Sequence, residues 1–379
     1  MSSLFNHKFI VFSGEHYNPL GVIRSLGEKG IKPVAIVLSG GAPLTSKSKY
    51  ISKLHLVGDR EEGFRILMEE YADSQNPPFV YCCDDRTISF VDHHYQEMEG
   101  KFYFFNAGSE GRINQFLNKE NIGKLALKHG LNFLPEIVVD KGIVPDNLSY
   151  PVLTKAIDST ENGWKNDMFI CHSDSELQIA FQKIKSPRVM IQKYIKKKNE
   201  YCLEGFSCNR GQDVFISIES IYDYRLPMSY SPYMTANNFS NKNNVFPSLQ
   251  GMFAEIGFEG IFEVEFLEAK DGTLYFGEIN FRNSTWSYAS TCGGMNLPYL
   301  WAESMLQGHQ ADNCYCEIPK PGFKAMVETT DFKERVIKRK YPLVKWLKDL
   351  HNSKCKYYIG RNDFAPVISE VGARLLHKQ

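Results

Sequence analysis

The chain has 379 residues, enough for two or three compact units, and 43% of them are hydrophobic, so sizeable cores can form. The 44 Lys and Arg residues balance 44 Asp and Glu, and this net charge of zero gives no electrostatic reason to expect a nucleic acid or a membrane as partner. No apolar run approaches transmembrane length, the N-terminus lacks a signal-peptide pattern and the nine cysteines are scattered, so we expect a cytoplasmic protein with reduced thiols.

The first 110 residues alternate strand and helix patterns. Strands are expected at 8–14, 32–40, 53–59, 78–85 and 101–106, and helices at 19–30 and 60–72. This order predicts a Rossmann-like domain with a mostly parallel sheet, whose ligands bind in loops after the carboxyl ends of strands. The first such loop, 13–21, contains Glu15 but no G-x-G-x-x-G, so it does not support a nicotinamide cofactor.

The loop after the fourth strand carries Asp84, Asp85 and Arg86. A guanidinium at this position would suit a bidentate clamp on a substrate carboxylate. The alternative is that Arg86 forms an ion pair with one of the two neighbouring aspartates.

Two lysines in the next segment, 111–190, are candidates for binding phosphate. Asn118 is an expected N-cap, which places Lys119 in the first turn of a helix, where the helix dipole disfavours a cation unless an anion is bound nearby. Lys155 ends a β-rich stretch and precedes a polar loop with Ser159 and Lys165, which could hold phosphate oxygens. A surface lysine followed by an ordinary turn is the alternative for Lys155.

An apolar strand beginning near residue 189 runs into Gln192, Tyr194 and Ile195, and a lysine-rich turn then leads to Glu200. Such a segment can offer backbone groups to an adenine edge, and a carboxylate a few residues later can bind ribose hydroxyls. The lysines themselves are expected to form a solvated turn. Strands dominate from here to about residue 310.

The stretch "GIFEVEFLEAKDGTLYFGEINFR" predicts a hairpin that turns at Asp271-Gly272. Glu278, Asn280 and Arg282 then share one face, with Glu265 opposite Glu278 and Glu263 opposite Asn280. Carboxylates placed directly opposite each other repel unless a cation lies between them, and Mg²⁺ prefers such oxygen ligands. The alternative is an exposed acidic face that binds nothing.

These features together resemble the ATP-grasp superfamily along about 300 residues. The resemblance implies an N-terminal Rossmann-like domain (1–110), a small ATP-grasp lobe (111–190), a large lobe with the metal site (191–310) and a basic C-terminal extension (311–379) that matches nothing in the family. For the extension we expect one or two strands and a helix at 341–352. The fold class is α/β and α+β.

The resemblance also implies roles for individual residues. By position, Lys119 and Lys155 match the lysines that contact ATP phosphates, and Arg282 matches the arginine facing the reactive phosphate. The adenine linker is matched by Gln192, Tyr194 and Ile195, and the ribose-binding acid by Glu200. The Mg²⁺ ligands are matched by Glu265, Glu278 and Asn280. Gln192 stands where several members carry Glu, and the loop after Lys155 has one glycine where many have several.

Within the superfamily, the segment after the metal strand is similar to carboxylate–amine ligases such as D-aspartate ligase and to the large chain of carbamoyl-phosphate synthase. The expected cofactors are ATP and Mg²⁺, with two ions and with Mn²⁺ as a substitute. A small carboxylate, with an amino acid as one option, would be activated as an acyl phosphate and joined to an amine. Candidates for binding these substrates are Arg86, Glu263, Ser284 and the loop of Glu15, and Glu263 could receive an ammonium group. The alternatives are a synthetase or kinase that releases a phosphorylated product, and a non-catalytic nucleotide-binding protein. A homodimer is left open.

Overall fold

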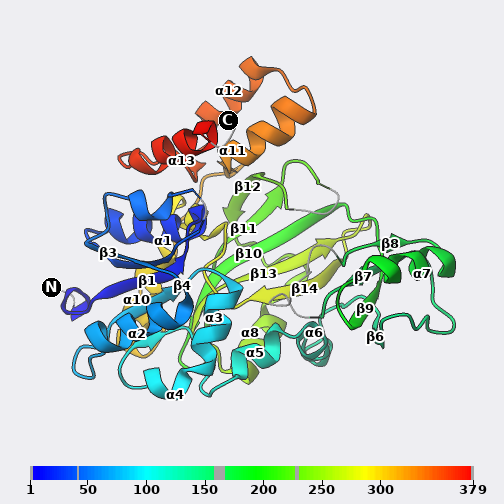
Figure 1. Ribbon diagram of the computed structural model, residues 1–379, viewed down its shortest axis with the longest axis horizontal. Coiled ribbons are helices and arrows are strands. Elements are labelled where there is room, and N and C mark those ends of the chain that lie inside the picture. Colours follow the sequence, from blue (N-terminus) through cyan, green and yellow to red (C-terminus); the bar gives the residue numbers. More distant parts are fainter. Residues whose placement is uncertain (1–2, 41, 158–166, 227–229, 377–379) are drawn as a thin grey trace.

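The computed structural model describes residues 3–40, 42–157, 167–226 and 230–376 (Figure 1). Its strands form three sheets of five, seven and four strands. This mixture of a parallel sheet with further sheets and helices confirms the expected fold class, while the domain boundaries expected at residues 110, 190 and 310 stay predictions.

The five-stranded sheet is built by the first hundred residues and is parallel throughout, in the order β3-β2-β1-β4-β5. Its strands are β1 (Phe9–Gly14), β2 (Val34–Leu38), β3 (Lys53–Val57), β4 (Phe79–Cys82) and β5 (Tyr103–Phe104). The accompanying helices are η1 (Ser3–Asn6), α1 (Tyr17–Glu28), η2 (Thr45–Lys47), α2 (Arg60–Tyr71), α3 (Asp85–His93) and α4 (Tyr95–Met98). β1 and β4 are apolar and buried, as expected for strands covered on both faces.

Helix α3 starts directly after β4 because Asp84 caps it. The Asp84 carboxylate accepts a hydrogen bond from the backbone N–H of Thr87 at 2.8 Å, which satisfies a free donor of the first turn. Asp85 is consequently the first helical residue, at the carboxyl end of the central part of the sheet.

The four-stranded sheet has the order β6-β9-β7-β8 and is antiparallel. It comprises β6 (Glu136–Asp140), β7 (Val152–Lys155), β8 (Ile170–Cys171) and β9 (Arg188–Lys193), and it packs with helix α7 (Asp174–Lys183). Helices α5 (Arg112–Leu117) and α6 (Lys119–Lys128) precede it, and Asn118 caps α6 by accepting hydrogen bonds from the N–H groups of Glu120 and Asn121.

The seven-stranded sheet has the order β14-β13-β10-β11-β12-β15-β16. Its strands are β10 (Asn199–Cys208), β11 (Asp213–Tyr222), β12 (Tyr233–Asn238), β13 (Gly260–Glu268), β14 (Leu274–Asn280), β15 (Phe323–Met326) and β16 (Cys355–Lys356). The helices of this part are η3 (Lys242–Asn244), α8 (Phe246–Ile256), α9 (Ser287–Cys292) and α10 (Leu297–Gln307).

The C-terminal segment adds two strands to the large sheet and four helical segments, α11 (Glu328–Asp331), the π-helical η4 (Phe332–Lys338), α12 (Leu343–Asn352) and α13 (Ala365–Leu376). The sequence predicted the strands and α12 but not α11, η4 or α13. Arg24 of α1 anchors this segment, because its buried guanidinium donates to the carbonyls of Tyr357 and Tyr358 and lies 3.0 Å from the carboxylate of Asp363. In the described part of the chain, every helix is too short or too polar to cross a bilayer.

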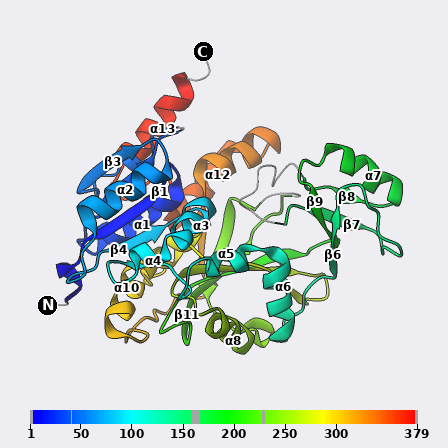
Figure 2. The ribbon, with the colours of Figure 1, turned by 60° about the horizontal axis from the view of Figure 1, so that its bottom comes forward.

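Three separate hydrophobic cores lie among the described residues. The largest is continuous from the five-stranded sheet through the seven-stranded sheet and includes β16. A small one, around Tyr233, Met326 and Trp346, joins β12 and β15 to α12. The four-stranded sheet and α7 have a core of their own. Figure 2 shows this unit on the side of the molecule away from the N-terminal sheet.

Candidate active site

The predicted acidic hairpin is present as β13 and β14. Glu265 pairs with Glu278 and Glu263 pairs with Asn280, as the sequence predicted. The turn itself differs from the prediction: the backbone N–H of Ala269 donates to the carbonyl of Thr273, which leaves a three-residue loop, Lys270–Gly272, in place of a two-residue turn at Asp271-Gly272.

The longer loop shifts the pairing next to the turn by one residue, so that Glu268 faces Leu274. A β-bulge between Glu265 and Phe266 then restores the predicted register on the acidic side. Gly277 of β14 is the extra, unpaired residue of this bulge, and a Cβ atom there would come 2.9 Å from the Glu265 carbonyl oxygen. The bulge therefore explains why the distant pairs agree with a prediction whose turn was wrong.

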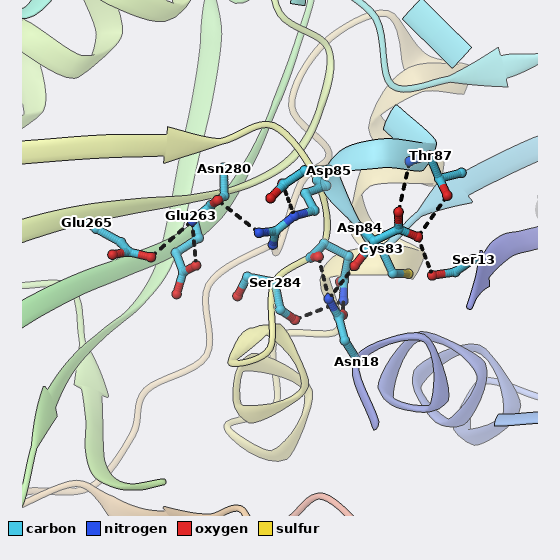
Figure 3. Close-up of polar contacts among 12 residues, drawn as sticks. Ser13, Asn18, Cys83, Asp84, Asp85, Thr87, Glu263, Glu265, Asn280 and Ser284 are labelled. Atoms are coloured by element: carbon cyan, nitrogen blue, oxygen red, sulfur yellow. Dashed lines mark hydrogen bonds and ion pairs between the residues drawn. The ribbon is translucent and has the colours of Figure 1, made fainter. Parts of the chain in front are cut away.

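The expected metal ligands lie side by side on this hairpin. The Asn280 amide nitrogen donates to Glu263 at 2.9 Å and to Glu265 at 3.1 Å, as Figure 3 shows. Burial and the neighbouring carboxylates raise the pKa of Glu265 well above its usual value. Crowded, buried oxygen donors of this kind suit a hard divalent cation, because the cation would offset their mutual repulsion.

This donor set contains two carboxylates and one amide. No group of three or more His, Cys, Asp or Glu side chains in a metal-binding arrangement occurs in the described ranges. The two-carboxylate set is nevertheless adequate for Mg²⁺, which usually keeps several water ligands and binds substrate phosphate oxygens as well.

Lys119 and Arg282 supply the positive charge of the site. The Lys119 ammonium lies 2.5 Å from a carboxylate oxygen of Glu278, and this contact with the lysine lowers the pKa of Glu278. Arg282 lies 2.5 Å from the carboxylate of Asp85 through its Nε and donates to the Asn280 amide oxygen at 3.0 Å through Nη2. The N-terminal unit therefore contributes Asp85 to the site, a residue that the sequence analysis did not select.

A cavity of about 280 Å³, called the larger cavity below, opens between the four-stranded sheet and the large sheet. Its lining contains most of the expected nucleotide-binding residues, Lys119, Lys155, Gln192, Tyr194, Ile195 and Glu200, together with apolar side chains such as Leu134, Leu153 and Leu267. Lys155 donates to the Gln192 side-chain oxygen at 2.9 Å, and Gln192 donates to Glu136 at 2.9 Å. Burial and the charge of Lys119 lower the pKa of Lys155 to about 8.

Within this cavity Glu200 forms an ion pair with Lys197 of the lysine-rich turn. Ser159 and Lys165, the expected residues of the loop after Lys155, lie outside the described residues.

A neighbouring cavity, of about 160 Å³, is called the smaller cavity below. It is lined by acidic and basic side chains and by an apolar and aromatic wall, namely Asp85, Glu263, Asn280, Arg282, Phe116, Leu117, Ile122, Tyr222, Tyr230, Ile279, Thr285 and Trp286. Lys119, Tyr230, Glu265 and Glu278 line both cavities, so two of the three expected metal ligands stand between the two, while Asn280 lines only the smaller one.

Three of the expected substrate residues lie elsewhere. Arg86 is exposed on the first turn of α3 and lines neither cavity, and the carboxylate of Asp84 is paired with Arg60 at 3.1 Å. Glu15 accepts a hydrogen bond from the backbone N–H of Leu44 at 2.9 Å and so holds the segment before η2. Ser284 donates its hydroxyl to Glu204 at 2.7 Å and lines neither cavity.

Comparisons of the sequence with models of protein families and with curated proteins find no match. Comparisons of the structure with solved structures find many. An L-amino acid ligase from Bacillus licheniformis superposes with a TM-score of 0.61 at 15% identity, covering 79% of this chain and 74% of the ligase. The N5-carboxyaminoimidazole synthetase of Staphylococcus aureus superposes with a TM-score of 0.64 at 15% identity, covering 88% of this chain and 86% of that enzyme.

Biotin carboxylase from Campylobacter jejuni, solved in complex with an ATP analogue, superposes with a TM-score of 0.63 at 16% identity and covers 83% of this chain and 74% of its own. These superpositions cover 79%, 88% and 83% of a chain whose parallel N-terminal sheet is followed by a small and a large sheet. The chain therefore has the ATP-grasp fold.

Proposed function

We propose that this protein is an ATP-dependent ligase that phosphorylates a small carboxylate to an acyl phosphate and couples it to an amine, releasing ADP and phosphate. The observation that carries the proposal is the position of Glu265 and Glu278 between a nucleotide-sized cavity and a smaller one that contains Arg282. The fold neighbours include an L-amino acid ligase and a synthetase solved with ADP, which agrees with this chemistry.

In this proposal the larger cavity holds ATP. The apolar side chains from both sheets would surround the base, the linker of Tyr194 and Ile195 would bind its edge, and Glu200 would bind the ribose. Lys119 and Lys155 would bind the phosphates. Mg²⁺ held by Glu265, Glu278 and Asn280 would neutralise phosphate charge, which is its usual contribution to phosphoryl transfer.

The smaller cavity would hold the carboxylate to be phosphorylated. Arg282 would orient that carboxylate and stabilise negative charge as the phosphoryl group is transferred, and Asp85 would hold the guanidinium in position. An amine would then attack the acyl carbon, forming a C–N bond as phosphate leaves and the amine loses a proton. Two metal ions, Mn²⁺ as a substitute, a homodimer and a cytoplasmic location stay predictions.

The test is a screen for ADP release with Mg²⁺, ATP and a panel of small carboxylates, with and without amines, followed by mass spectrometry of the products. A ligase releases ADP only when a carboxylate is present and forms an amide when an amine is added. A phosphorylated product without amine dependence would instead support the synthetase or kinase alternative. No substrate-dependent release of ADP would overturn the proposal in favour of a nucleotide-binding protein.

A further inference from the structure

The smaller cavity has a second pair of carboxyl groups behind its metal ligands. Glu204 of β10 and Glu263 of β13 are directly opposite each other in the antiparallel sheet, and their side chains are 0% and 4% exposed. The two carboxyl groups contact each other. The hydroxyls of Ser284 and Ser287 each donate to Glu204 at 2.7 Å, so the pair is held in place from one side.

The charge of Arg282 partly offsets the rise in the pKa of both carboxyl groups, but within the described ranges neither group has a cation at ion-pair distance. Lys119 is paired with Glu278 and Arg282 with Asp85, and within the described ranges no Lys, Arg or His forms an ion pair with Glu204 or Glu263. Two carboxyl groups that lie directly opposite each other repel when both are ionised, so nearby positive charge favours their ionisation. A buried negative charge without a partner is costly, so this place in the cavity suits a positively charged ligand group.

The wall around Glu263 favours a cation as well. Tyr222, Tyr230 and Trp286 line the same cavity, and the ring of Trp286 lies 6.2 Å from that of Tyr222 and 6.3 Å from that of Tyr230. Aromatic faces attract ammonium groups through their quadrupoles. The cavity volume of about 160 Å³ limits the ligand to a small molecule.

An anion-binding group lies next to this cation-binding group. The amide nitrogen of Asn280 donates to Glu263, and its amide oxygen accepts from Arg282, so one side chain separates the carboxylate from the guanidinium (Figure 3). A ligand that fits both must carry an ammonium group and a carboxylate group only a few ångströms apart. An α-amino acid has this geometry.

We propose that the carboxylate substrate is a small α-amino acid, bound with its ammonium group at Glu263 and its carboxylate toward Arg282. Glu204 is a positioning residue, directly opposite Glu263 in the sheet, whose second carboxyl group favours a cation at Glu263. This inference rests on the proposed function for the role of Arg282, but the ammonium site can be tested without turnover.

The test uses matched pairs in which a hydroxyl replaces the amine: L-alanine and L-lactate, L-serine and L-glycerate, L-aspartate and L-malate, L-glutamate and L-2-hydroxyglutarate. Dissociation constants are measured by calorimetry or ligand-observed NMR, with and without Mg²⁺ and a non-hydrolysable ATP analogue. At least one amino acid is expected to bind about 10-fold or more tightly than its hydroxy acid, because a charge-assisted contact is lost in the hydroxy acid.

Variants locate the preference. Glu263→Gln is expected to reduce the amine-to-hydroxyl ratio about 10-fold or more, and Glu204→Gln by a smaller factor. The matched control is Glu219→Gln, because Glu219 is a buried carboxylate, 8% exposed, on the neighbouring strand β11, bonded to Tyr201 and outside both cavities. The control is expected to keep the wild-type ratio.

Wild-type protein that binds no amino acid, or that binds hydroxy acids equally well, overturns the inference without any variant. An unchanged ratio in a folded Glu263→Gln protein also overturns it, since the pair would then be purely structural. Failure of the proposed function looks different: selective binding of an amino acid without ADP release would leave the ammonium site intact and exclude the ligase. ADP release with a carboxylate that lacks an amine, at equal efficiency, would exclude the amino acid and leave the ligase.

Discussion

The carboxylate of Asp85 lies 2.5 Å from the Nε of Arg282, although Asp85 begins helix α3, Arg282 follows strand β14 and the two are 197 positions apart. Their side chains are 22% and 15% exposed, so the ion pair is largely shielded from water. It joins the first turn of α3 to the end of the acidic hairpin of β13 and β14. The orientation of the guanidinium in the smaller cavity therefore depends on the N-terminal unit.

We expect Asp85→Ala to lower kcat by about 10- to 100-fold while changing the KM for ATP much less, because Arg282 would lose the group that orients it for the reaction. The melting temperature should also fall, since a shielded guanidinium would lose its charged partner. Steady-state kinetics and thermal unfolding measure both effects. Asp312→Ala, which removes an exposed carboxylate, is the control; an unchanged kcat in the Asp85 variant would show that Arg282 does not need this partner.

Glu278→Gln tests the metal site. It should leave the fold intact and lower turnover by at least about 100-fold, because the charge that binds the cation is lost. Titration with Mn²⁺ followed by electron paramagnetic resonance should show weaker binding in the variant, independently of activity. Glu120→Gln, at a glutamate on α6 paired with Lys124 outside both cavities, provides the control. Near-normal turnover and Mn²⁺ affinity would remove Glu278 from the ligand set.

Lys155 gives the nucleotide site a pH dependence. Its pKa in the folded protein is lowered from 10.5 to about 8, mainly by burial and also by Lys119. The ammonium that would bind phosphate is therefore present below this pKa and is lost above it, so kcat/KM for ATP should fall as the pH rises through about 8. Lys155→Arg should remove this step because a guanidinium stays charged, and the same step in both proteins would assign the titration to another group.

The lowered pKa of Lys155 has an opposite effect on stability. Between about 8 and 10.5 the unfolded chain binds more protons at this residue than the folded chain, so its contribution to the free energy of unfolding rises with pH. The contribution should be absent in the Lys155→Arg variant. Denaturant titrations of both proteins across this range measure the difference.

The sequence and the structure lead to different predictions for the substitution of Arg86. A carboxylate clamp formed by this residue would make Arg86→Ala raise the KM for the carboxylate substrate by roughly 10- to 100-fold. Because Arg86 is exposed and lines neither cavity, we now expect this KM to change by less than about twofold. A large rise in KM with an unchanged KM for ATP would restore the clamp.

Much of the nucleotide site could be predicted from local sequence patterns. Side chains alternate along a strand, so the face shared by Glu278 and Asn280 follows from spacing alone, and the N-cap at Asn118 fixes the position of Lys119 in the same local way. The prediction of a two-residue turn at Asp271-Gly272 was wrong, because this dipeptide does not reveal that Lys270 also belongs to the loop. The compensating bulge at Gly277 depends on contacts between two strands and has no signal in either strand by itself.

The residues that the sequence analysis missed are placed by tertiary structure. Asp85 was one of three charged neighbours in a loop, and only the packing of α3 against the hairpin selects it over Arg86. Glu204 offered a weak signal, the one charge in the buried part of β10 from 201 to 208, but its partner Glu263 is 59 positions away. Helix α13 was missed because the sequence analysis found no pattern for the end of the chain.

The separate cores have a mechanical consequence. The two larger sheets share one hydrophobic core and Arg24 anchors the C-terminal segment to α1, whereas the four-stranded sheet and α7 have a core of their own. The larger cavity is lined by Lys155 and Gln192 from the four-stranded sheet and by Glu265 and Leu267 from the seven-stranded sheet. A ligand bound there would contact both sheets. It should therefore reduce the movement of the four-stranded sheet and α7 relative to the rest of the molecule, and make the molecule measurably more compact in solution scattering.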